Sequence, residues 1–254
     1  MGAHQGPIGG VDHLPQGGER DRGAFWRKTD EAGGDDKVVA VRSMFDAIAP
    51  RYDLVNRVMT FRMDVGWRRR TIRELALPHG STVLDLACGT GDLCGGLAEA
   101  GLRPIGMDLS FGMLAAGTSG APLAQADALR LPVPDGSVDG VTCGFALRNF
   151  VELPPFFAEL GRVVRPLGRI ALLEVAEPAN PVLRWGHGIY FGKVVPKIGG
   201  LLSDPAAYQY LPKSVAYLPE PEVMLAQLAD CGFERIERTL LSTGIAQLIT
   251  ATRT

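Results

Sequence analysis

The stretch Val83-Leu84-Asp85-Leu86-Ala87-Cys88-Gly89-Thr90-Gly91-Asp92-Leu93 decides the fold of this chain. A short apolar run over residues 82–86 predicts a buried strand that delivers Asp85 to the carboxyl edge of a sheet. Gly89 and Gly91 allow a tight turn with close backbone approach. A helix then runs to about Ala100, and its free N–H groups point at whatever lies over the turn. Open α/β sheets bind their ligands at this edge.

The glycine spacing separates this turn from two common nucleotide-binding motifs. No third glycine completes Gly-x-Gly-x-x-Gly, and no Gly-Lys-Ser/Thr follows as in a P-loop. An NAD-dependent oxidoreductase uses the same sheet but needs the missing glycine. A nicotinamide titration would separate that reading from the one developed below.

Apolar runs of strand length alternate with helical patterns along the rest of the chain. We expect further strands at residues 104–108, 122–127, 138–143, 169–175, 234–240 and 244–250, and helices from about 110, at 153–164 and at 220–231. This alternation predicts βαβ units with right-handed crossovers. The expected fold class is therefore Rossmann-like α/β, with a seven-stranded, mostly parallel sheet and helices on both faces.

The chain divides into a tail and one domain. Residues 1–36 are rich in glycine and polar residues, which predicts a disordered tail. Residues 37–254 suit a single domain in length. It begins with a helical cap over 37–78, with helices at 38–49 and 64–75. Val41, Met44, Phe45 and Ile48 share one face of the first helix. Residues 178–219 form an insertion that we interpret as a lid.

Composition excludes several classes of partner. The formal net charge of −2 gives no basic footprint for nucleic acid. The four cysteines lack zinc-ligand spacing, so no metal site is expected. No secretory signal and no run of roughly 18 apolar residues occurs. We therefore expect a cytoplasmic protein that meets any lipidic substrate at the inner face of the membrane. The sequence leaves open whether it forms a homodimer.

Two further acids lie at expected strand ends. Asp108 ends the second strand, where a carboxylate can accept both hydroxyls of a ribose. Asp127-Ala128 ends the third strand, where a polar group can meet an adenine edge. Alone, such acids are often helix caps or solvated groups. In series with Asp85 and the two glycines they indicate a site for a ligand with a ribose and an adenine.

At this point the chain resembles class I methyltransferases and, within them, the ubiquinone/menaquinone biosynthesis C-methyltransferase family, from about Asp36 to the C-terminus. The glycine turn is common to methyltransferases. Three segments are more specific: Phe45-Asp46-x-x-Ala49-x-x-Tyr52-Asp53-x-x-Asn56, Leu147-Arg148-Asn149, and Tyr208-x-Tyr210-Leu211-x-x-Ser214.

The resemblance implies S-adenosylmethionine as cofactor and C-methylation of a polyprenylated hydroquinone, namely demethylmenaquinol. Together with the turn it assigns these residues to the cofactor: Asp85, Gly89, Thr90, Gly91, Asp108, Asp127, Ala128 and Gly144. It places Tyr52, Arg148 and Asn149 at the reaction site. Two alternatives stay open. One is a class I methyltransferase acting on another small aromatic or natural-product acceptor; the other is a non-catalytic relative that serves as a scaffold.

The chain also departs from the family pattern. Residues 109–123 are short, Asp64 stands where many members have histidine, and residues 174–178 replace a more usual Glu-Phe-Ser run. These departures bear on the acceptor more than on the reaction class. Because arginine is always protonated, we expect Arg148 to stabilise a quinol oxyanion rather than to abstract a proton. The alternative for Arg148 is a structural salt bridge to Glu174 or Glu152.

Aromatic and basic residues occur together in two segments. The insertion holds Trp185, Tyr190 and Phe191 with nearby cations, and the helix at 64–75 holds Trp67 with an arginine run at 68–70. This combination suits a membrane interface. The alternative is a solvated face with core aromatics. We expect His187, within the insertion, to line the surface or the pocket rather than to act as a base.

Overall fold

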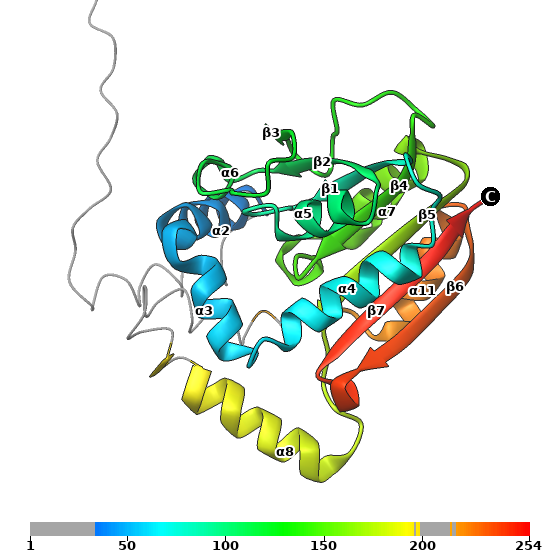
Figure 1. The fold of residues 1–254 in the computed structure, drawn as a ribbon. Helices are drawn as coiled ribbons and strands as arrows, with labels where there is room; N and C mark the ends of the chain where they lie inside the picture. The colour runs from blue at the N-terminus through cyan, green and yellow to red at the C-terminus, as the bar shows by residue number, and fades with distance from the viewer. Residues whose placement is uncertain (1–33, 196, 199–213, 215–216) are drawn as a thin grey trace, which may run out of the picture.

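The computed structural model describes residues 34–195, 197–198, 214 and 217–254. It contains a sheet whose strands are β1 (Thr82–Leu86), β2 (Arg103–Asp108), β3 (Leu123–Gln125), β4 (Val138–Gly144), β5 (Val164–Val175), β6 (Phe233–Leu241) and β7 (Ala246–Arg253) (Figure 1). Most of the expected tail lies outside the described residues. The first helix, α2 (Gly34–Ile48), begins four residues earlier than the predicted helix.

The seven strands follow the order β3-β2-β1-β4-β5-β7-β6. β1 pairs in parallel with β2 and β4, whereas β7 runs antiparallel to both β5 and β6. The predicted mostly parallel sheet is thus confirmed. The strand order reverses between β1 and β4, and a crevice at the carboxyl ends of the strands opens at such a switch point.

Helices cover both faces of the sheet, as predicted. One face carries α4 (Met63–Leu75) and α5 (Asp92–Glu99); the other carries α7 (Leu153–Val163) and α11 (Pro221–Asp230). Strand β5 shows why both faces must be covered. Ile170 and Leu172 pack on the side of α7 and α11, while Ala171 and Leu173 pack on the side of α4, and all four are fully buried. Alternate side chains of one strand point to opposite faces.

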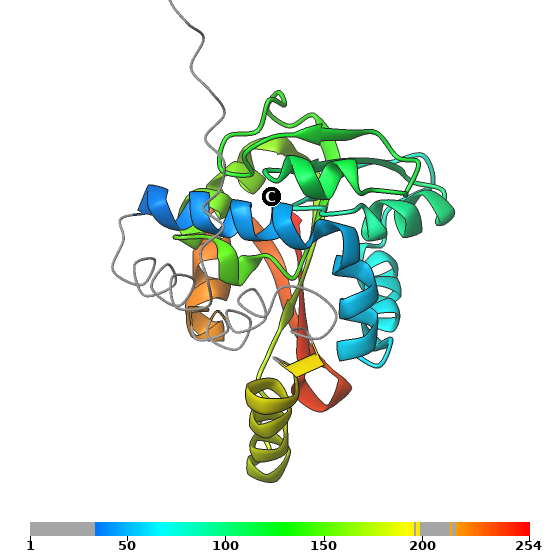
Figure 2. The same ribbon diagram turned by 90° about the vertical axis from the view of Figure 1, so that its left-hand side faces the viewer.

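The N-terminal cap contains one helix that the sequence pattern did not reveal. Helix α2 ends at Ile48, a 3₁₀ turn η1 (Ala49–Arg51) holds Pro50, and α3 (Tyr52–Met59) follows at once. Pro50 does end the first helix as expected, because its ring cannot continue the helical hydrogen bonds. Helix α2, which precedes this turn, crosses over the carboxyl edge of the sheet (Figure 2).

The insertion after β5 contains a helical stretch over residues 181–195. Asn180 caps α8 (Pro181–Ile189) by accepting hydrogen bonds from the amides of Val182 and Leu183. A π-helical turn, η3 (Tyr190–Val194), continues it. Val195 is buried against Val55 and other side chains of the N-terminal helices. Across the described ranges, no helix is both long and apolar enough to cross a membrane.

Candidate active site

The glycine turn after β1 forms the floor of the site. Gly89 and Gly91 have φ of +58° and +86°, a left-handed conformation that side chains with a Cβ rarely adopt. A Cβ on Gly91 would lie 2.6 Å from Ser119 Oγ, so this glycine is also required for packing. Gly91 supports the turn as the N-cap of α5 but does not itself line the cavity described below.

Asp108 holds the turn in place from the end of β2. Its carboxylate accepts hydrogen bonds from the amides of Gly89 and Ser110, each at 2.8 Å. Burial raises the pKa of Asp108, and the nearby carboxylate of Asp46 raises it further. Each carboxylate oxygen offers about two acceptor sites, so Asp108 can still accept from a ligand.

Asp85 lies at the base of the turn and is fully buried. It accepts a hydrogen bond from Thr142 Oγ1 at 2.8 Å and from the Cys94 thiol at 3.5 Å. Burial raises its pKa to about 7, despite these two hydrogen bonds. The site therefore holds a carboxyl group whose charge is poorly compensated, and a cationic ligand group would favour its ionised form.

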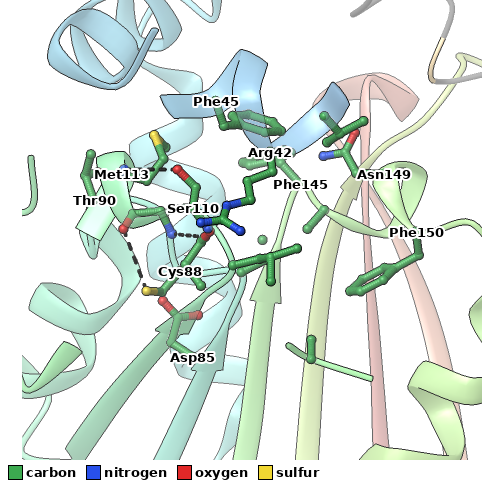
Figure 3. Close-up of a pocket in the computed structure, with 18 of the residues that line it drawn as sticks. Arg42, Phe45, Asp85, Cys88, Thr90, Ser110, Met113, Phe145, Asn149 and Phe150 are labelled. Carbon is green, nitrogen blue, oxygen red and sulfur yellow. Dashed lines mark hydrogen bonds between the residues drawn. The ribbon is translucent and has the colours of Figure 1, made fainter. Parts of the chain in front are cut away.

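A first cavity of about 180 Å³ lies over this turn. Of the eight predicted cofactor residues, only Gly91 does not line it. The seven that do are Asp85, Gly89, Thr90, Asp108, Asp127, Ala128 and Gly144. Figure 3 shows Asp85 rising from the strand below and Arg42 and Phe45 entering from α2 above. Phe45 was predicted on the apolar face of the first helix, and Arg42 was not predicted as a site residue. An arginine adjacent to an apolar helix face is not by itself a binding signal.

A second cavity, of about 370 Å³, lies between α3, α4 and the insertion. Apolar and aromatic side chains dominate its wall: Met59, Phe61, Met63, Trp67, Phe145, Val175, Val182, Leu183, Tyr190, Phe191 and Ile245. Its volume lies within the usual range for a small-molecule site. Residues 182–191 form one side of this cavity, where the sequence placed a lid.

The two cavities share part of their lining. Tyr52, Arg68 and Phe145 line both. Tyr52 was predicted at the reaction site. Arg68 was interpreted only as part of a basic run, and Phe145, two residues before the Leu147-Arg148-Asn149 segment, was not predicted as a site residue. Burial raises the pKa of Tyr52, although Arg148 and a hydrogen bond from Asn56 oppose the shift. Its phenol therefore stays protonated at neutral pH and acts as a hydrogen-bond donor rather than a base.

Arg148 and Asn149, although adjacent in sequence, line different cavities. Arg148 lines the second cavity, and Asn149 lines the first. The guanidinium of Arg148 forms an ion pair with Glu174, which is fully buried on β5. Glu174, not Glu152, is thus its partner, so the salt bridge considered as an alternative exists. Arg148 Nε and Asn149 Oδ1 are buried without a hydrogen-bond partner among the described residues.

One arginine of the predicted basic helix is neutralised by two acids. Arg68 pairs with the buried Asp64 on its own helix and reaches Asp92 of the glycine turn at 3.4 Å. Trp67 is a core residue whose Nε1 donates to Ser242 Oγ at 2.8 Å. For Trp67 and Arg68, the reading as core and paired residues therefore replaces the membrane-facing one. Asp64, the departure from the family pattern, lines the second cavity.

The remaining family segment is mostly outside the described part of the chain. Residues 208–213 belong to it and are not described, whereas Ser214 is buried. Asp53, from the segment that opens the family pattern, accepts a hydrogen bond from Thr90 Oγ1 at 2.9 Å. This bond joins α3 directly to the glycine turn.

Comparison with known proteins agrees with this geometry. A profile of the ubiE/COQ5 methyltransferase family matches residues 31–253. The demethylmenaquinone methyltransferase of Deinococcus radiodurans is 43% identical over 83% of this chain and 91% of its own length. The ubiquinone/menaquinone biosynthesis C-methyltransferase UbiE of Syntrophotalea carbinolica is 38% identical over 84% and 93%.

A solved structure shares the fold at low sequence identity. It is a SAM-dependent methyltransferase of Thermotoga maritima, titled a possible histamine N-methyltransferase. Its TM-score is 0.60 at 17% identity, covering 84% of this chain and all of that one (100%). At this identity the likeness supports the class I methyltransferase fold alone.

Proposed function

The chain belongs to the ubiE/COQ5 methyltransferase family, and we propose that it methylates a ring carbon of a reduced polyprenylated quinone, demethylmenaquinol in particular. It is a methyltransferase, and its methyl donor is S-adenosylmethionine. The observation that carries the proposal is the shared wall of Tyr52, Arg68 and Phe145. It lies between the first cavity, which contains the acidic residues at the strand ends, and the apolar second cavity. Methyl transfer needs donor and acceptor held in line across such a boundary.

The first cavity fits the donor by its chemistry. Asp85 offers a buried carboxylate to a cationic amino group, and Asp108 offers acceptors to ribose hydroxyls. The unpartnered Asn149 Oδ1 can accept a further hydrogen bond there. Asp127 already accepts from the amide of Leu129, which fixes its carboxylate at the mouth of the cavity beside Ala128. When bound, the donor supplies an already activated sulfonium methyl group.

The second cavity fits an aromatic acceptor. Its wall of Trp67, Phe145, Tyr190 and similar side chains suits the faces of a quinol ring. Arg148 lies at this wall, and its unpartnered Nε can donate a hydrogen bond to a quinol oxygen. Because Glu174 neutralises the guanidinium, we propose Arg148 as a hydrogen-bond donor that orients the acceptor, rather than as a full countercharge.

We also propose that the protein contacts a membrane surface through α8 and the end of α3. Val182, Trp185 and Phe61 are each at least 70% exposed there. Tyr190 joins the two segments by donating to the carbonyl of Met59 at 2.7 Å and by packing on Phe61. Exposed cations accompany them at Arg62, Lys193 and Lys197. Large apolar side chains flanked by cations favour an anionic lipid surface, and the second cavity lies directly behind them.

The experiment is to incubate the protein with S-adenosylmethionine carrying an isotopically labelled methyl group and with reduced demethylmenaquinone in detergent. We expect a labelled methyl group on a ring carbon, detected by mass spectrometry. Binding of the donor without this product would contradict the quinol assignment and favour another aromatic acceptor. Failure to bind the donor would favour a non-catalytic scaffold. A matched control is the exposed His79→Gln variant, which lies on the turn before β1 and lines neither cavity.

A further inference from the structure

We infer that His187 accepts the hydroxyl proton of the acceptor through Nε2 in the second cavity. This inference rests on the proposed function, because it takes a quinol as the occupant of that cavity. Quinol carbons are weak nucleophiles until the hydroxyl loses or shares its proton, so a proton acceptor is required near the ring. The sequence led us to expect that His187 lines the surface or the pocket. Its surroundings in the structure support a role as proton acceptor.

The position of the imidazole is defined by its neighbours. His187 lies on α8, and its ring packs on Phe191 with centroids 4.3 Å apart. Its Nε2 is buried and has no hydrogen-bond partner among the described residues. The same cavity is lined by Arg148 and Tyr52, so His187 faces the same space as these two residues. An unpartnered buried nitrogen is costly unless a ligand satisfies it.

Other titratable groups at this cavity are already committed. Asp64 accepts from Thr60 Oγ1 at 2.7 Å and pairs with Arg68. Burial raises the pKa of Tyr190, whose hydroxyl donates to a backbone carbonyl. Tyr52 likewise remains a protonated phenol, and Arg148 is a permanent cation. Among the described titratable residues that line the second cavity, His187 is therefore the one that can still accept a proton.

Burial, not neighbouring charge, favours the neutral ring of His187. Burial lowers the pKa of His187, and Glu177, which follows β5, opposes this shift. The facing groups are Tyr52 from α3, Asp64 and Arg68 from α4, Arg148 beside Glu174, and Tyr190 from η3. A neutral imidazole with its proton on Nδ1 presents Nε2 as an acceptor.

The proton and electron balance is complete within the two substrates, His187 and water. The O–H bond of the quinol breaks, and its proton passes to Nε2. The oxygen electron pair moves into the ring, a bond forms between the ortho carbon and the methyl carbon, and the methyl–sulfur bond breaks with its pair remaining on sulfur. The methylated carbon then loses its hydrogen to water as a proton, and His187 returns its proton to the oxygen. One proton is released overall.

The test compares His187→Gln, His187→Phe and His79→Gln in the full chain. Glutamine cannot take up a proton, phenylalanine keeps the packing on Phe191, and His79 serves as the matched control. Turnover of reduced demethylmenaquinone is measured against pH, with thermal melting and S-adenosylmethionine affinity measured in parallel. We expect both His187 variants to lose about 10²-fold or more in kcat, while melting and donor affinity stay at wild-type values. The wild type should lose kcat on the acid side as His187 protonates, and this limb should be absent in the variants.

A second measurement separates proton acceptance from packing. A series of naphthols with decreasing hydroxyl pKa is offered as acceptor, and the defect of His187→Gln should shrink as the acceptor ionises without help. Variant kcat within about twofold of wild type, or a defect equal across the series, would overturn the role. If the wild type itself methylates no quinol, the proposed function and this inference fall together. If the wild type is active and the variants match it, this inference alone fails.

Discussion

The buried carboxylate of Glu174 accepts hydrogen bonds from both the guanidinium and the backbone amide of Arg148. Arg148 is 5% exposed and Glu174 is fully buried, so neither charge has water to replace its partner. Glu174 also accepts from the amide of Val175 at 2.8 Å. This pair connects η2 (Leu147–Asn149) to the end of β5 at the wall of the second cavity.

The first prediction concerns this pair. Arg148→Ala or Glu174→Ala alone should lower the free energy of unfolding by about 3–5 kcal/mol, because each leaves an uncompensated buried charge. The double variant should lose clearly less than the sum, since no unpaired charge remains. Urea denaturation measures all three. Additive losses within about 0.5 kcal/mol would mean that the two residues are not coupled.

The second prediction concerns the pH dependence of stability through Asp85. Its pKa is about 7 in the folded chain against an ordinary value of 3.8, so the neutral carboxyl is favoured by folding. That stability is fully present below pH 3.8 and is lost as the pH rises to about 7, because the unfolded chain releases its proton first. Asp85→Asn should therefore gain about 4 kcal/mol relative to wild type across this window.

The measurement is urea denaturation of wild type and Asp85→Asn at several pH values without donor. The difference between them should grow from about pH 4 to about pH 7 and then level off. A difference that is flat with pH would show that Asp85 titrates normally. In donor titrations at neutral pH, the variant should bind S-adenosylmethionine more weakly despite its higher stability, because the carboxylate offered to the amino group is gone.

The third prediction separates binding from folding at Asn149. Its Oδ1 is buried in the first cavity without a partner, so Asn149→Leu removes an unsatisfied polar atom. Such a change is close to neutral for stability. The affinity for S-adenosylmethionine should nevertheless fall about tenfold, which corresponds to about 1.4 kcal/mol. Calorimetric titration together with thermal melting checks both parts. A large drop in melting temperature with unchanged affinity would assign Asn149 a structural role instead.

Local patterns were sufficient for the sheet and the glycine turn. The apolar run before Asp85 predicts a strand, and Gly89 and Gly91 predict a tight turn. Both predictions depend only on neighbouring residues, so they could be made from the sequence. Helix α3 was missed because it is short, begins at Tyr52 only two residues after Pro50, and has Arg51 as an N-cap residue that makes no side-chain capping hydrogen bond. Helix α8 could have been found, because Asn180 followed by Pro181 is a helix start signal.

The composition of the second cavity depends on long-range contacts that local sequence patterns do not show. Arg148 had two candidate partners, and the parallel pairing of β4 with β5, with Gly144 beside Leu173, brings Glu174 to it rather than Glu152. The sequence shows Arg68 only as part of a basic run. In the fold, its ion pairs with Asp64 and Asp92 hold it between the two cavities. The buried, unpartnered state of His187 Nε2 likewise emerges only when α8, α3 and α4 together line one cavity.

The last prediction tests the membrane contact. Trp185→Glu and Phe61→Glu place a charge where the native side chains are 72% and 70% exposed, so neither should destabilise the fold. Both should reduce binding to vesicles that contain anionic lipid, because apolar area is lost and like charge is added. Sedimentation with such vesicles measures the bound fraction.

Leu167→Glu is the matched control, since Leu167 is equally exposed but lies near the start of β5, the strand whose far end leads to α8. Turnover in detergent should stay near wild type in Trp185→Glu and Leu167→Glu, whereas turnover of vesicle-embedded quinol should fall in Trp185→Glu alone of these two. Phe61 also lines the second cavity, so its variant is used for vesicle binding only. Equal vesicle binding by all three variants would show that α8 and the end of α3 do not form the contact surface.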